Sequence, residues 1–291
     1  MKIAVVGLGG VGGYLGAKLC SLKDDEIIFI ARGEHLQAIK DKGLGLIDID
    51  EENYYKPSEA CETYTKPLDV IFLCTKGYHT KSALENLSKA ITPNTIIIPI
   101  ANGVDSIATI TPLTPAKVLD ACVYIVSHKV SAGLVKKSTK VFALILPKEL
   151  EKVLGSRLEK AGLRVKFVED IQKEVWKKYL FISAMGTMTS FYEKGMGTIY
   201  KEHHEELVSV LKEIFSVAKA EGIKIEEKEI DKALNTASKL PLDAPTSLWL
   251  DFKNNTHNEL DTISTYIVKT AQVHKIKVPL MQKMNKVLSD R

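Results

Sequence analysis

The glycine-rich run VVGLGGVGGYLGAKL constrains the fold of this chain more than any other feature. Gly7, Gly9 and Gly12 have GxGxxG spacing and follow an apolar run that is typical of a buried strand. In a strand–turn–helix unit the first glycine permits the tight turn, the second lets the backbone approach a diphosphate, and the third allows close helix packing. The spacing therefore predicts a βαβ unit that binds a dinucleotide at the start of its helix. The residues expected to contact the dinucleotide are Gly7, Gly9, Gly10, Val11 and Gly12.

Apolar and helical runs alternate after this turn. The apolar runs are nearly continuous, as expected of parallel strands covered on both faces. Strands are expected at 2–7, 26–31, 68–75, 95–100 and 117–126, and helices at about 11–22, 34–42, 79–90 and 104–110. A hairpin-like pair at 127–135 and 140–146, a helix at about 149–161 and a strand at 163–168 come next. Alternation of this kind predicts right-handed βαβ units in a doubly wound sheet.

From about residue 170 the β pattern stops, and helical runs replace it. They cover 171–192, 201–220, 227–238 and a final pair within 246–290. The sequence therefore predicts an α/β protein with an N-terminal Rossmann-type doubly wound sheet, residues 1–168. An all-helical C-terminal domain, residues 169–291, is expected after it. A chain of 291 residues is long enough for two domains, each with its own core.

Composition narrows the class of protein. The net charge of +4 is spread along the chain, so it suits an anionic small molecule but gives no basic block for nucleic acid or a membrane surface. The four cysteines form no CxxC pair, and no apolar stretch approaches the roughly 18 residues of a membrane span. The pair His203–His204 lies in a polar run and is expected to be exposed and to bind no metal. We expect a cytoplasmic protein without a disulfide framework, a metal site or a membrane segment.

The residue that comes after the second strand indicates the type of dinucleotide. NAD-preferring sites carry Asp or Glu roughly 20 residues after the glycine turn, where the carboxylate binds the ribose hydroxyls. Here that position is Arg32. A carboxylate would repel a 2′-phosphate, whereas a guanidinium binds it with paired charge-assisted hydrogen bonds. Arg32 therefore favours NADP(H), with a surface arginine in a loop as the alternative.

Further motifs occur in order along the chain. They are FLCTKGYHT with Lys76, IANGVD with Asn102, W-x-K from Trp176 to Lys178, and a late set of Ser247, Asp251 and Glu259. Together with the glycine turn and the ARG after the second strand, these motifs resemble the ketopantoate reductase family over almost the whole chain. Members of that family use NADPH to reduce ketopantoate, a 2-oxo acid, to pantoate on the route to pantothenate and coenzyme A. The resemblance implies the same fold, cofactor and type of activity.

The resemblance also assigns the catalytic roles. Lys178 would donate a proton to the oxygen that becomes negative as hydride reaches the oxo carbon. Helical spacing alone does not choose between Lys177 and Lys178, because both lie on apolar stripes of the expected helix. Glu259 would hold the ammonium group and relay a proton. The run THNE, which begins at Thr256, is also a capping-box pattern, so Glu259 has a structural alternative as a helix cap.

Three more residues are expected to bind substrate or cofactor. Ser247 would donate its hydroxyl to the substrate carboxylate, or else cap a helix. Asn102 and Lys76 lie just past strand ends, where open α/β sheets bind ligands. Asn102 would hold the nicotinamide ribose or the substrate, with a turn-forming asparagine as the alternative. Lys76 would lie at the cofactor and attract the acid group.

The pattern departs from the family at two positions. The family carries substrate-facing asparagines four and eight residues after the lysine, and here those positions are Ile182 and Gly186. A buried substrate hydroxyl left unpaired costs about 1–3 kcal/mol, so ketopantoate should bind less well and a more apolar acid better. Three hypotheses remain: a ketopantoate reductase, a D-2-hydroxy acid dehydrogenase acting on a more apolar 2-oxo acid, and a catalytically weak NADP(H)-binding sensor. The sequence is compatible with a monomer or a homodimer.

Overall fold

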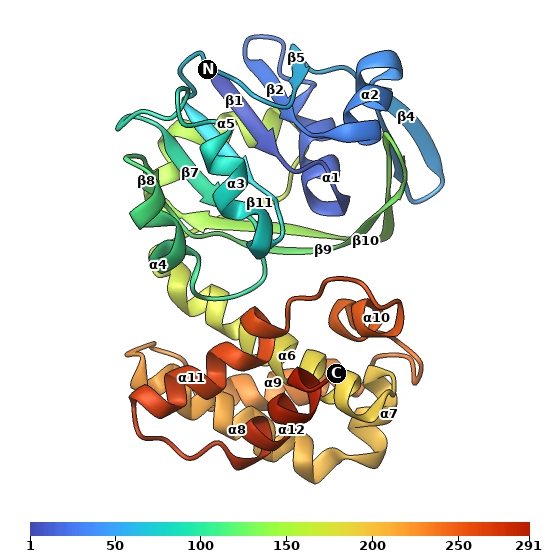
Figure 1. Ribbon diagram of the computed structural model, residues 1–291, viewed down its shortest axis with the longest axis vertical. Helices are drawn as coiled ribbons and strands as arrows, with labels where there is room; N and C mark the ends of the chain where they lie inside the picture. Colours follow the sequence, from blue (N-terminus) through green and yellow to red (C-terminus); the bar gives the residue numbers. More distant parts are fainter. The chain divides into compact units, whose positions relative to one another are not determined.

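Six parallel strands build the main sheet of the N-terminal half, in the order β5-β2-β1-β6-β7-β8 (Figure 1). They are β1 (Lys2–Val6), β2 (Glu26–Ile30), β5 (Glu59–Cys61), β6 (Val70–Leu73), β7 (Ile96–Pro99) and β8 (Lys117–Val118). Residues of β1 alternate between two buried clusters: Ile3 and Val5 pack with helix α1 (Gly10–Leu19), and Ala4 and Val6 with helix α3 (Thr80–Glu85). Both faces of the sheet are therefore covered, which explains why its strands are nearly continuous apolar runs.

The computed structural model describes residues 1–291, which form two units. Unit 1 consists of residues 1–101 and 105–171, and unit 2 consists of residues 102–104 and 172–291. The main change between units thus falls after residue 171, whereas the sequence placed it after residue 168. Residues 102–104 belong to unit 2, and Val104 packs against its apolar core. A parallel-sheet unit followed by a helical one is the predicted fold class, which the structure confirms.

Unit 1 contains a second sheet, in which the predicted hairpin at 127–135 and 140–146 and the predicted strand at 163–168 are confirmed, whereas its other two strands were not predicted. Its strands are β3 (Leu44–Asp48), β4 (Glu51–Tyr55), β9 (Cys122–Ser131), β10 (Leu134–Pro147) and β11 (Val165–Val168). They run in the order β11-β10-β3-β4, and β9 pairs with β10 as an antiparallel hairpin. The prediction of a single strand at 117–126 is wrong, because this range contains two strands of different sheets: β8 in the main sheet and the start of β9 in the second. The apolar run continues where the chain changes sheets, so strand propensity alone gives no sign of the break.

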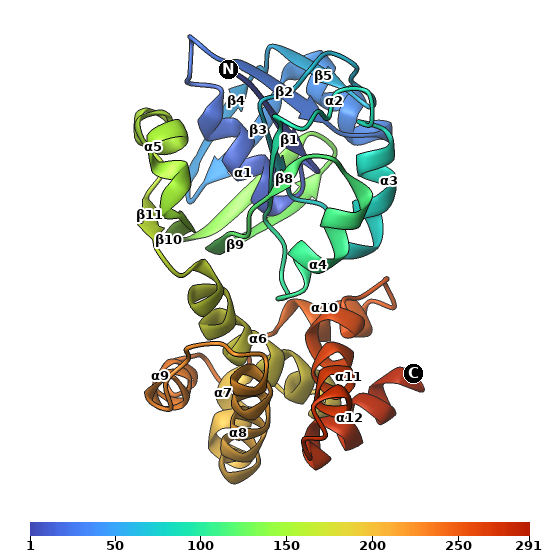
Figure 2. The ribbon, with the colours of Figure 1, turned by 90° about the vertical axis from the view of Figure 1, so that its left-hand side faces the viewer.

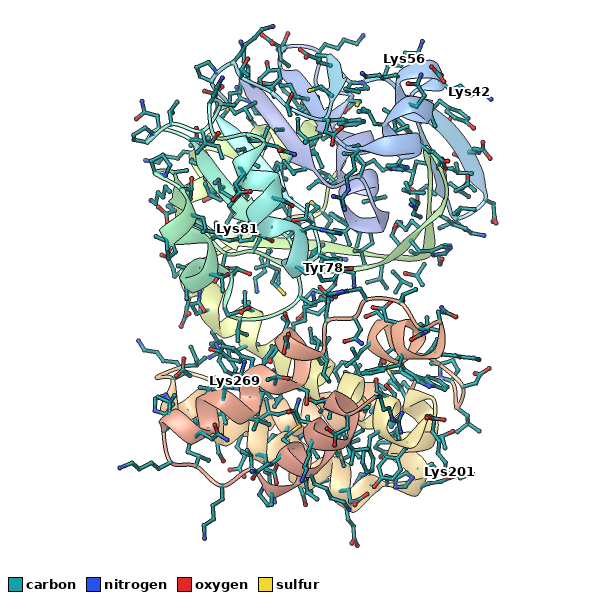
Figure 3. All side chains as sticks on the ribbon, in the orientation of Figure 1. Lys42, Lys56, Tyr78, Lys81, Lys201 and Lys269 are labelled. Carbon is teal, nitrogen blue, oxygen red and sulfur yellow. The ribbon has the colours of Figure 1, made fainter.

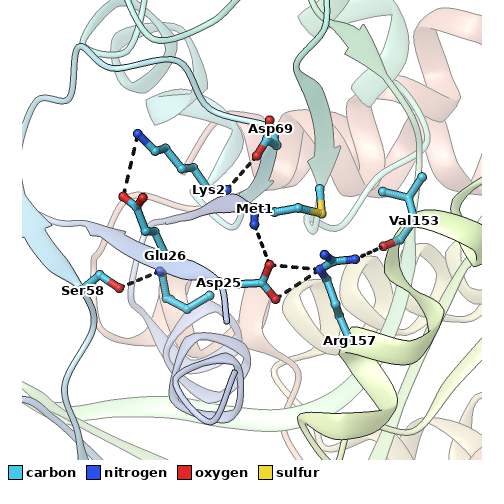
Figure 4. A network of polar contacts seen from close by, with 9 residues as sticks. Met1, Lys2, Asp25, Glu26, Ser58, Asp69, Val153 and Arg157 are labelled. Carbon is cyan, nitrogen blue, oxygen red and sulfur yellow. Dashed lines mark hydrogen bonds and ion pairs between the residues drawn. The ribbon is translucent and has the colours of Figure 1, made fainter. Parts of the chain in front are cut away.

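Asp25, directly before β2, ties separate segments of unit 1 together (Figure 4). Its carboxylate accepts a hydrogen bond from the ammonium of Met1 at 2.7 Å and from Nε of Arg157 at 3.1 Å. Arg157 lies on helix α5 (Glu151–Lys160) and also donates to the carbonyl of Val153. Although burial opposes ionisation, the hydrogen bonds from Met1 and Arg157 hold the pKa of Asp25 below its usual value.

Unit 2 is built around the long helix α6 (Ile171–Tyr192), with the other helices of the unit beside it (Figure 2). Its buried side chains form much of the apolar core. The other helices of this unit are α7 (Met196–Glu202), α8 (His204–Ala220), α9 (Lys228–Ala237), α10 (Ser247–Lys253), α11 (Tyr266–Val273) and α12 (Pro279–Ser289). A five-residue π-helical turn, Asp261–Thr265, precedes α11 directly. Helix α12 starts at a proline, and the carboxylate of Glu213 on α8 accepts its first amide hydrogens, from Leu280 at 3.0 Å and Met281 at 2.9 Å.

Charged side chains cover the surface of both units. The lysines labelled in Figure 3, which are Lys42, Lys56, Lys81, Lys201 and Lys269, are all exposed and come from different elements. Of the two adjacent histidines, His204 is exposed as expected, but the ring of His203 stacks on Tyr192 with 3.7 Å between ring centroids. None of the helices combines the length and apolar character that a membrane span requires.

Candidate functional site

Close packing explains three glycines of the turn between β1 and α1. Gly7 has φ +87°, a conformation that other residues rarely adopt, and its N–H donates to the carbonyl of Ile30 at 3.0 Å. A Cβ at Gly12 would lie 2.0 Å from the carbonyl oxygen of Gly7. A Cβ at Gly10 would lie 2.2 Å from the carbonyl oxygen of Ser127, on β9. The protein's own backbone therefore requires glycine at these positions.

Gly9 is different, because its surroundings impose no such requirement. It precedes the first residue of α1 with φ −70°, and a Cβ there would meet no atom within 4 Å. Helix α1 has no side-chain cap and no acidic residue in its first turn, which contains Val11. Its first amide groups and the positive end of its dipole therefore suit an anion. Since packing does not explain Gly9, the residues fit a diphosphate that closely approaches this backbone.

His35, on helix α2 (Gly33–Lys42), fixes the glycine turn from outside the motif. Its Nδ1 accepts a hydrogen bond from the N–H of Gly133 at 2.8 Å, and its Nε2 lies 2.8 Å from the carbonyl oxygen of Leu8. Because Nδ1 accepts, Nε2 carries the proton and donates to Leu8. Burial lowers the pKa of His35 below its usual value, and the nearby Lys129 adds to the effect. The imidazole thus holds the centre of the turn in its neutral form.

Arg32 meets a histidine that the sequence did not single out. It precedes α2, its side chain is exposed, and its Nη2 lies 2.9 Å from Nε2 of His79. His79 ends the short 3₁₀ turn Gly77–His79 after β6, and Lys76 is the residue before that turn. Both Arg32 and His79 lie past the carboxyl ends of parallel strands, on the side of the sheet where such folds bind ligands. Together they offer two nitrogen-rich groups to a phosphate.

The two adjacent lysines of α6 have different partners, although both are half-buried. Nζ of Lys177 donates to Oε1 of Glu174 at 2.7 Å, an ion pair within the same helix. Nζ of Lys178 donates to the amide oxygen of Asn102 at 3.0 Å, across 76 residues of sequence. Asn102 precedes Gly103, which has φ +114°, in the short segment 102–104 that belongs to unit 2. The structure therefore brings Lys178 and Asn102, both expected site residues, into direct contact.

Glu259 does not form the capping box that its sequence pattern suggested. The hydroxyl of Thr256 donates to the carbonyl of Asp251 at 3.2 Å instead of capping a helix that contains Glu259. The helical segment begins after Glu259, and the N–H of Leu260 is satisfied by the side chain of Asn258 at 3.0 Å. The capping box between Thr256 and Glu259 is therefore not formed. The side chain of Glu259 is nevertheless buried, with 8% of the residue exposed.

The two positions that depart from the family pattern lie in apolar surroundings. Gly186 is buried in α6, and a Cβ there would lie 2.9 Å from Cγ2 of Ile263. The same Cβ would lie 3.6 Å from Cδ2 of Leu248, in ordinary contact. Ile182, one turn earlier on α6, is half-buried. An asparagine at position 186 would therefore have to displace Ile263.

Ser247 is exposed and is the first residue of α10. The capping role belongs to the preceding residue, because the hydroxyl of Thr246 accepts the N–H of Trp249 at 3.2 Å. Thr246 in turn shares a hydrogen bond of 2.7 Å with Thr189 of α6. The capping alternative for Ser247 is thus wrong, and its hydroxyl is not used in the helix start.

Sequence reasoning missed His35 and His79, which contact the glycine turn and Arg32. His79 comes after the Lys76 motif at the end of a strand, so its place at the ligand-binding edge was a readable signal. Nothing in the sequence indicated His35, since its partner Gly133 lies 98 residues away. The expected site residues fall into two groups: those of the nucleotide turn belong to unit 1, and Asn102, Lys178, Ser247 and Glu259 belong to unit 2.

Comparison with known proteins identifies the family. The family model described as Ketopantoate reductase PanE/ApbA matches residues 3–145, and the model of its C-terminal part matches residues 170–290. The 2-dehydropantoate 2-reductase of Pyrococcus horikoshii is 26% identical, with 96% of this chain and 94% of the relative covered. The crystal structure of 2-dehydropantoate 2-reductase from Porphyromonas gingivalis has a TM-score of 0.87 and 28% identity over 99% of each chain. A ketopantoate reductase structure from Ralstonia eutropha has a TM-score of 0.90 and 25% identity, with 99% of this chain and 97% of that chain covered. The chain therefore belongs to the ketopantoate reductase family of NAD(P)-dependent oxidoreductases, which act on CH–OH groups.

Proposed function

We propose that this protein reduces a 2-oxo acid to a 2-hydroxy acid with NADPH, and that ketopantoate is the substrate to test first. The observation that carries the proposal is the hydrogen bond that Nζ of Lys178 donates to the side-chain amide oxygen of Asn102. Relatives that are 25–28% identical and named 2-dehydropantoate 2-reductases support the choice of substrate. Reduction adds a hydride to the oxo carbon and a proton to its oxygen. The bound nicotinamide would supply the hydride.

Lys178 would supply the proton. Its Nζ donates to an amide oxygen, which only accepts hydrogen bonds. Asn102 fixes the direction of one N–H of the ammonium group. By contrast, Lys177 is engaged by the carboxylate of Glu174. Placing a general acid in this way contributes about 10²–10⁴-fold to the rate of such a step.

Glu259 would act with Lys178, as the family resemblance implies. Its carboxylate is buried, and the capping box with Thr256 is not formed. A buried carboxylate can hold an ammonium group and pass protons between it and solvent. Ser247, whose hydroxyl is exposed at the start of α10, would donate to the carboxylate of the acid.

Arg32 and His79 would bind the 2′-phosphate that distinguishes NADPH from NADH. The guanidinium is exposed and pairs with an imidazole nitrogen, so no carboxylate of an NAD-type site stands at this position. Gly9 and the first turn of α1 would hold the diphosphate, and Lys76 would lie near it. To test this, NADPH and NADH binding should be compared for wild type and Arg32→Ala. Loss of charge-assisted hydrogen bonds should weaken NADPH about 10–100-fold, with NADH unchanged.

A second candidate substrate, a more apolar 2-oxo acid, is favoured by the surroundings of Gly186. Ile263 and Leu248 occupy the space beside this position, where the family carries an asparagine. A substrate hydroxyl would find no amide partner there, whereas a branched or aryl group would lose nothing. A D-mandelate dehydrogenase crystallised with NADH and anilino(oxo)acetate has the same fold, with a TM-score of 0.87 at 21% identity over 100% of this chain and 98% of that one. The fold by itself therefore does not choose between the two acids or the two cofactors.

The decisive experiment monitors NADPH absorbance with purified protein and either ketopantoate or an aryl 2-oxo acid. It compares wild type, Lys178→Ala and the matched control Lys177→Ala. We expect turnover that falls about 10²–10⁴-fold in Lys178→Ala and stays near wild type in Lys177→Ala. Preference for the aryl acid would establish the second candidate. NADPH binding without oxidation by any acid would refute both and leave the sensor hypothesis.

A further inference from the structure

We propose that Tyr179 and Ser183 are positioning residues for the reaction, because their hydroxyls hold the π-helical turn Asp261–Thr265 that orients Glu259. The proposal rests on the function assigned above to Lys178 and Glu259. Tyr179 and Ser183 are not part of any motif considered in the sequence. All of these residues belong to unit 2.

The hydroxyls of α6 bind two carbonyls inside the turn. Oη of Tyr179 donates to the carbonyl of Thr262 at 2.6 Å and lies 3.3 Å from that of Ile263. Oγ of Ser183, one turn further along α6, donates to the carbonyl of Ile263 at 2.6 Å. Tyr179 is 1% exposed and Ser183 is 0% exposed, so water does not compete for these bonds.

A π-helical turn needs such donors. Its hydrogen bonds join residues five apart, as shown by the N–H of Tyr266, which donates to the carbonyl of Asp261. Where this wider spacing meets the ordinary helix, the backbone ladder is interrupted and carbonyls need other donors. Side chains that reach in from a neighbouring helix are one way to supply them. Tyr179 and Ser183 therefore stabilise the π-turn over a regular helix.

The π-turn in turn decides the direction of the Glu259 side chain. Glu259 lies just before it in the chain, and its carbonyl accepts the N–H of Ile263 at 2.9 Å. A π-turn holds one residue more than an α-helical turn, and an α-helix turns by about 100° per residue. If the π-turn became regular α-helix, the segment that contains Glu259 would therefore rotate by about that angle relative to helix α11. Without the π-turn, the buried carboxylate of Glu259 would point to a different part of the unit.

Tyr179 also lies next to Lys178 in the sequence, so one residue connects the two proposed catalytic groups. Its ring is fixed by edge-to-face contacts with Trp176, at 5.5 Å and 83°, and with Tyr266, at 6.1 Å and 86°. The backbone of α6 at Lys178 and the turn after Glu259 are thereby held by the same side chain. A displacement of about 1 Å at a reacting group can cost 10²-fold in rate.

The test uses Tyr179→Phe, Ser183→Ala and the double variant, with Ser190→Ala as the matched control. Ser190 is an equally buried serine of α6, but its hydroxyl donates at 2.7 Å to Gly186 of its own helix. We expect kcat to fall about 10–100-fold in the double variant, and less in each single variant, with the KM for NADPH unchanged. The pH profile of kcat should change in the same variants, because Glu259 is reoriented. Ser190→Ala should retain the wild-type kcat and pH profile.

Two outcomes separate this inference from the function on which it rests. If Lys178→Ala abolishes turnover but the single and double variants match Ser190→Ala in kcat and pH profile, the positioning role is refuted and the proposed function stands. If Lys178→Ala retains wild-type turnover, the proposed function itself fails. The single variant Tyr179→Phe preserves the ring and its packing, so it remains informative even where the double variant does not fold.

Discussion

Replacing Gly186 by alanine tests the packing that separates this chain from the family pattern. Glycine in a helix interior costs about 1 kcal/mol relative to alanine, so the helix alone would gain stability from Gly186→Ala. The new Cβ would lie 2.9 Å from Cγ2 of Ile263, however, and forcing an extra methyl into a filled core costs about 1–3 kcal/mol. Ile263 cannot easily retreat, since its side chain is branched at Cβ and its carbonyl is held by Ser183. We expect Gly186→Ala to lower the free energy of unfolding by about 0–2 kcal/mol.

Ile263→Leu provides the complementary change, because leucine lacks the Cγ2 methyl. In that background the alanine should meet no obstacle and should raise stability by about 1 kcal/mol. The two substitutions should therefore show a coupling energy of about 1–3 kcal/mol. Urea unfolding monitored by tryptophan fluorescence suits the measurement, because both tryptophans, Trp176 and Trp249, lie in unit 2. An effect of Gly186→Ala that is equal in both backgrounds, within about 0.5 kcal/mol, would refute the reasoning. Ile263 would then no longer account for the absence of the family's substrate-facing amide.

Three further predictions concern the nucleotide unit and the helical core. Gly9→Ala should leave the free energy of unfolding within about 0.5 kcal/mol of wild type and raise the KM for NADPH. Gly10→Ala should instead destabilise unit 1, because its Cβ clashes with β9. Thermal unfolding and NADPH titration distinguish the two variants, and equal effects would contradict the packing argument. Because burial lowers the pKa of His35, only the unfolded chain takes up a proton there as the pH falls below about 6.5, so the stability of unit 1 should decrease below that pH. His35→Gln should weaken this dependence in calorimetry, and an unchanged profile would count against the neutral bridge to Gly133. Glu213→Gln should cost unit 2 about 1–2 kcal/mol in the tryptophan-monitored unfolding, since both carboxylate oxygens accept amide hydrogens of α12 and glutamine has only one acceptor oxygen. A silent substitution would show that the cap contributes little.

Local periodicity was sufficient for four strands of the main sheet and for the helical character of the second unit. It missed β5, and it was wrong in joining α7 and α8 into one helix at 201–220 and in placing two helices within 246–290, where the structure has α10, α11 and α12. The apolar strands β1, β2, β6 and β7 are buried on both faces, so each is a continuous apolar run that the sequence displays directly. In the second sheet only β3 and β4 were missed, because they do not share that pattern. Strand β4 is mostly exposed, with the sequence EENYY, and its pairing with β3 is decided by the fold around it.

The capping alternatives show the limit of short motifs. THNE has the residue types of a capping box, yet the chain at Thr256 folds back on Asp251. In the same way Ser247 is the first residue of α10, but the N-cap position is one residue earlier, and the hydroxyl of Thr246 accepts the capping hydrogen bond from the N–H of Trp249. A cap depends on backbone geometry within a single turn, which residue types alone do not specify.

The sequence by itself determined the nucleotide-type fold, the helical second half and the family, because glycine spacing, strand periodicity and ordered motifs are local properties of the chain. Helical spacing could not choose between Lys177 and Lys178, since both lie on apolar stripes of the same helix, and the prediction of Lys178 came from the W-x-K motif alone. Only the tertiary structure shows that their partners differ: Lys177 pairs with Glu174 in its own helix, and Lys178 donates to Asn102 from far along the chain. The π-turn after Glu259 was likewise settled by tertiary contacts, because its carbonyls are satisfied by hydroxyls of α6. Contacts between residues distant in sequence depend on how the backbone packs, and no local pattern records them.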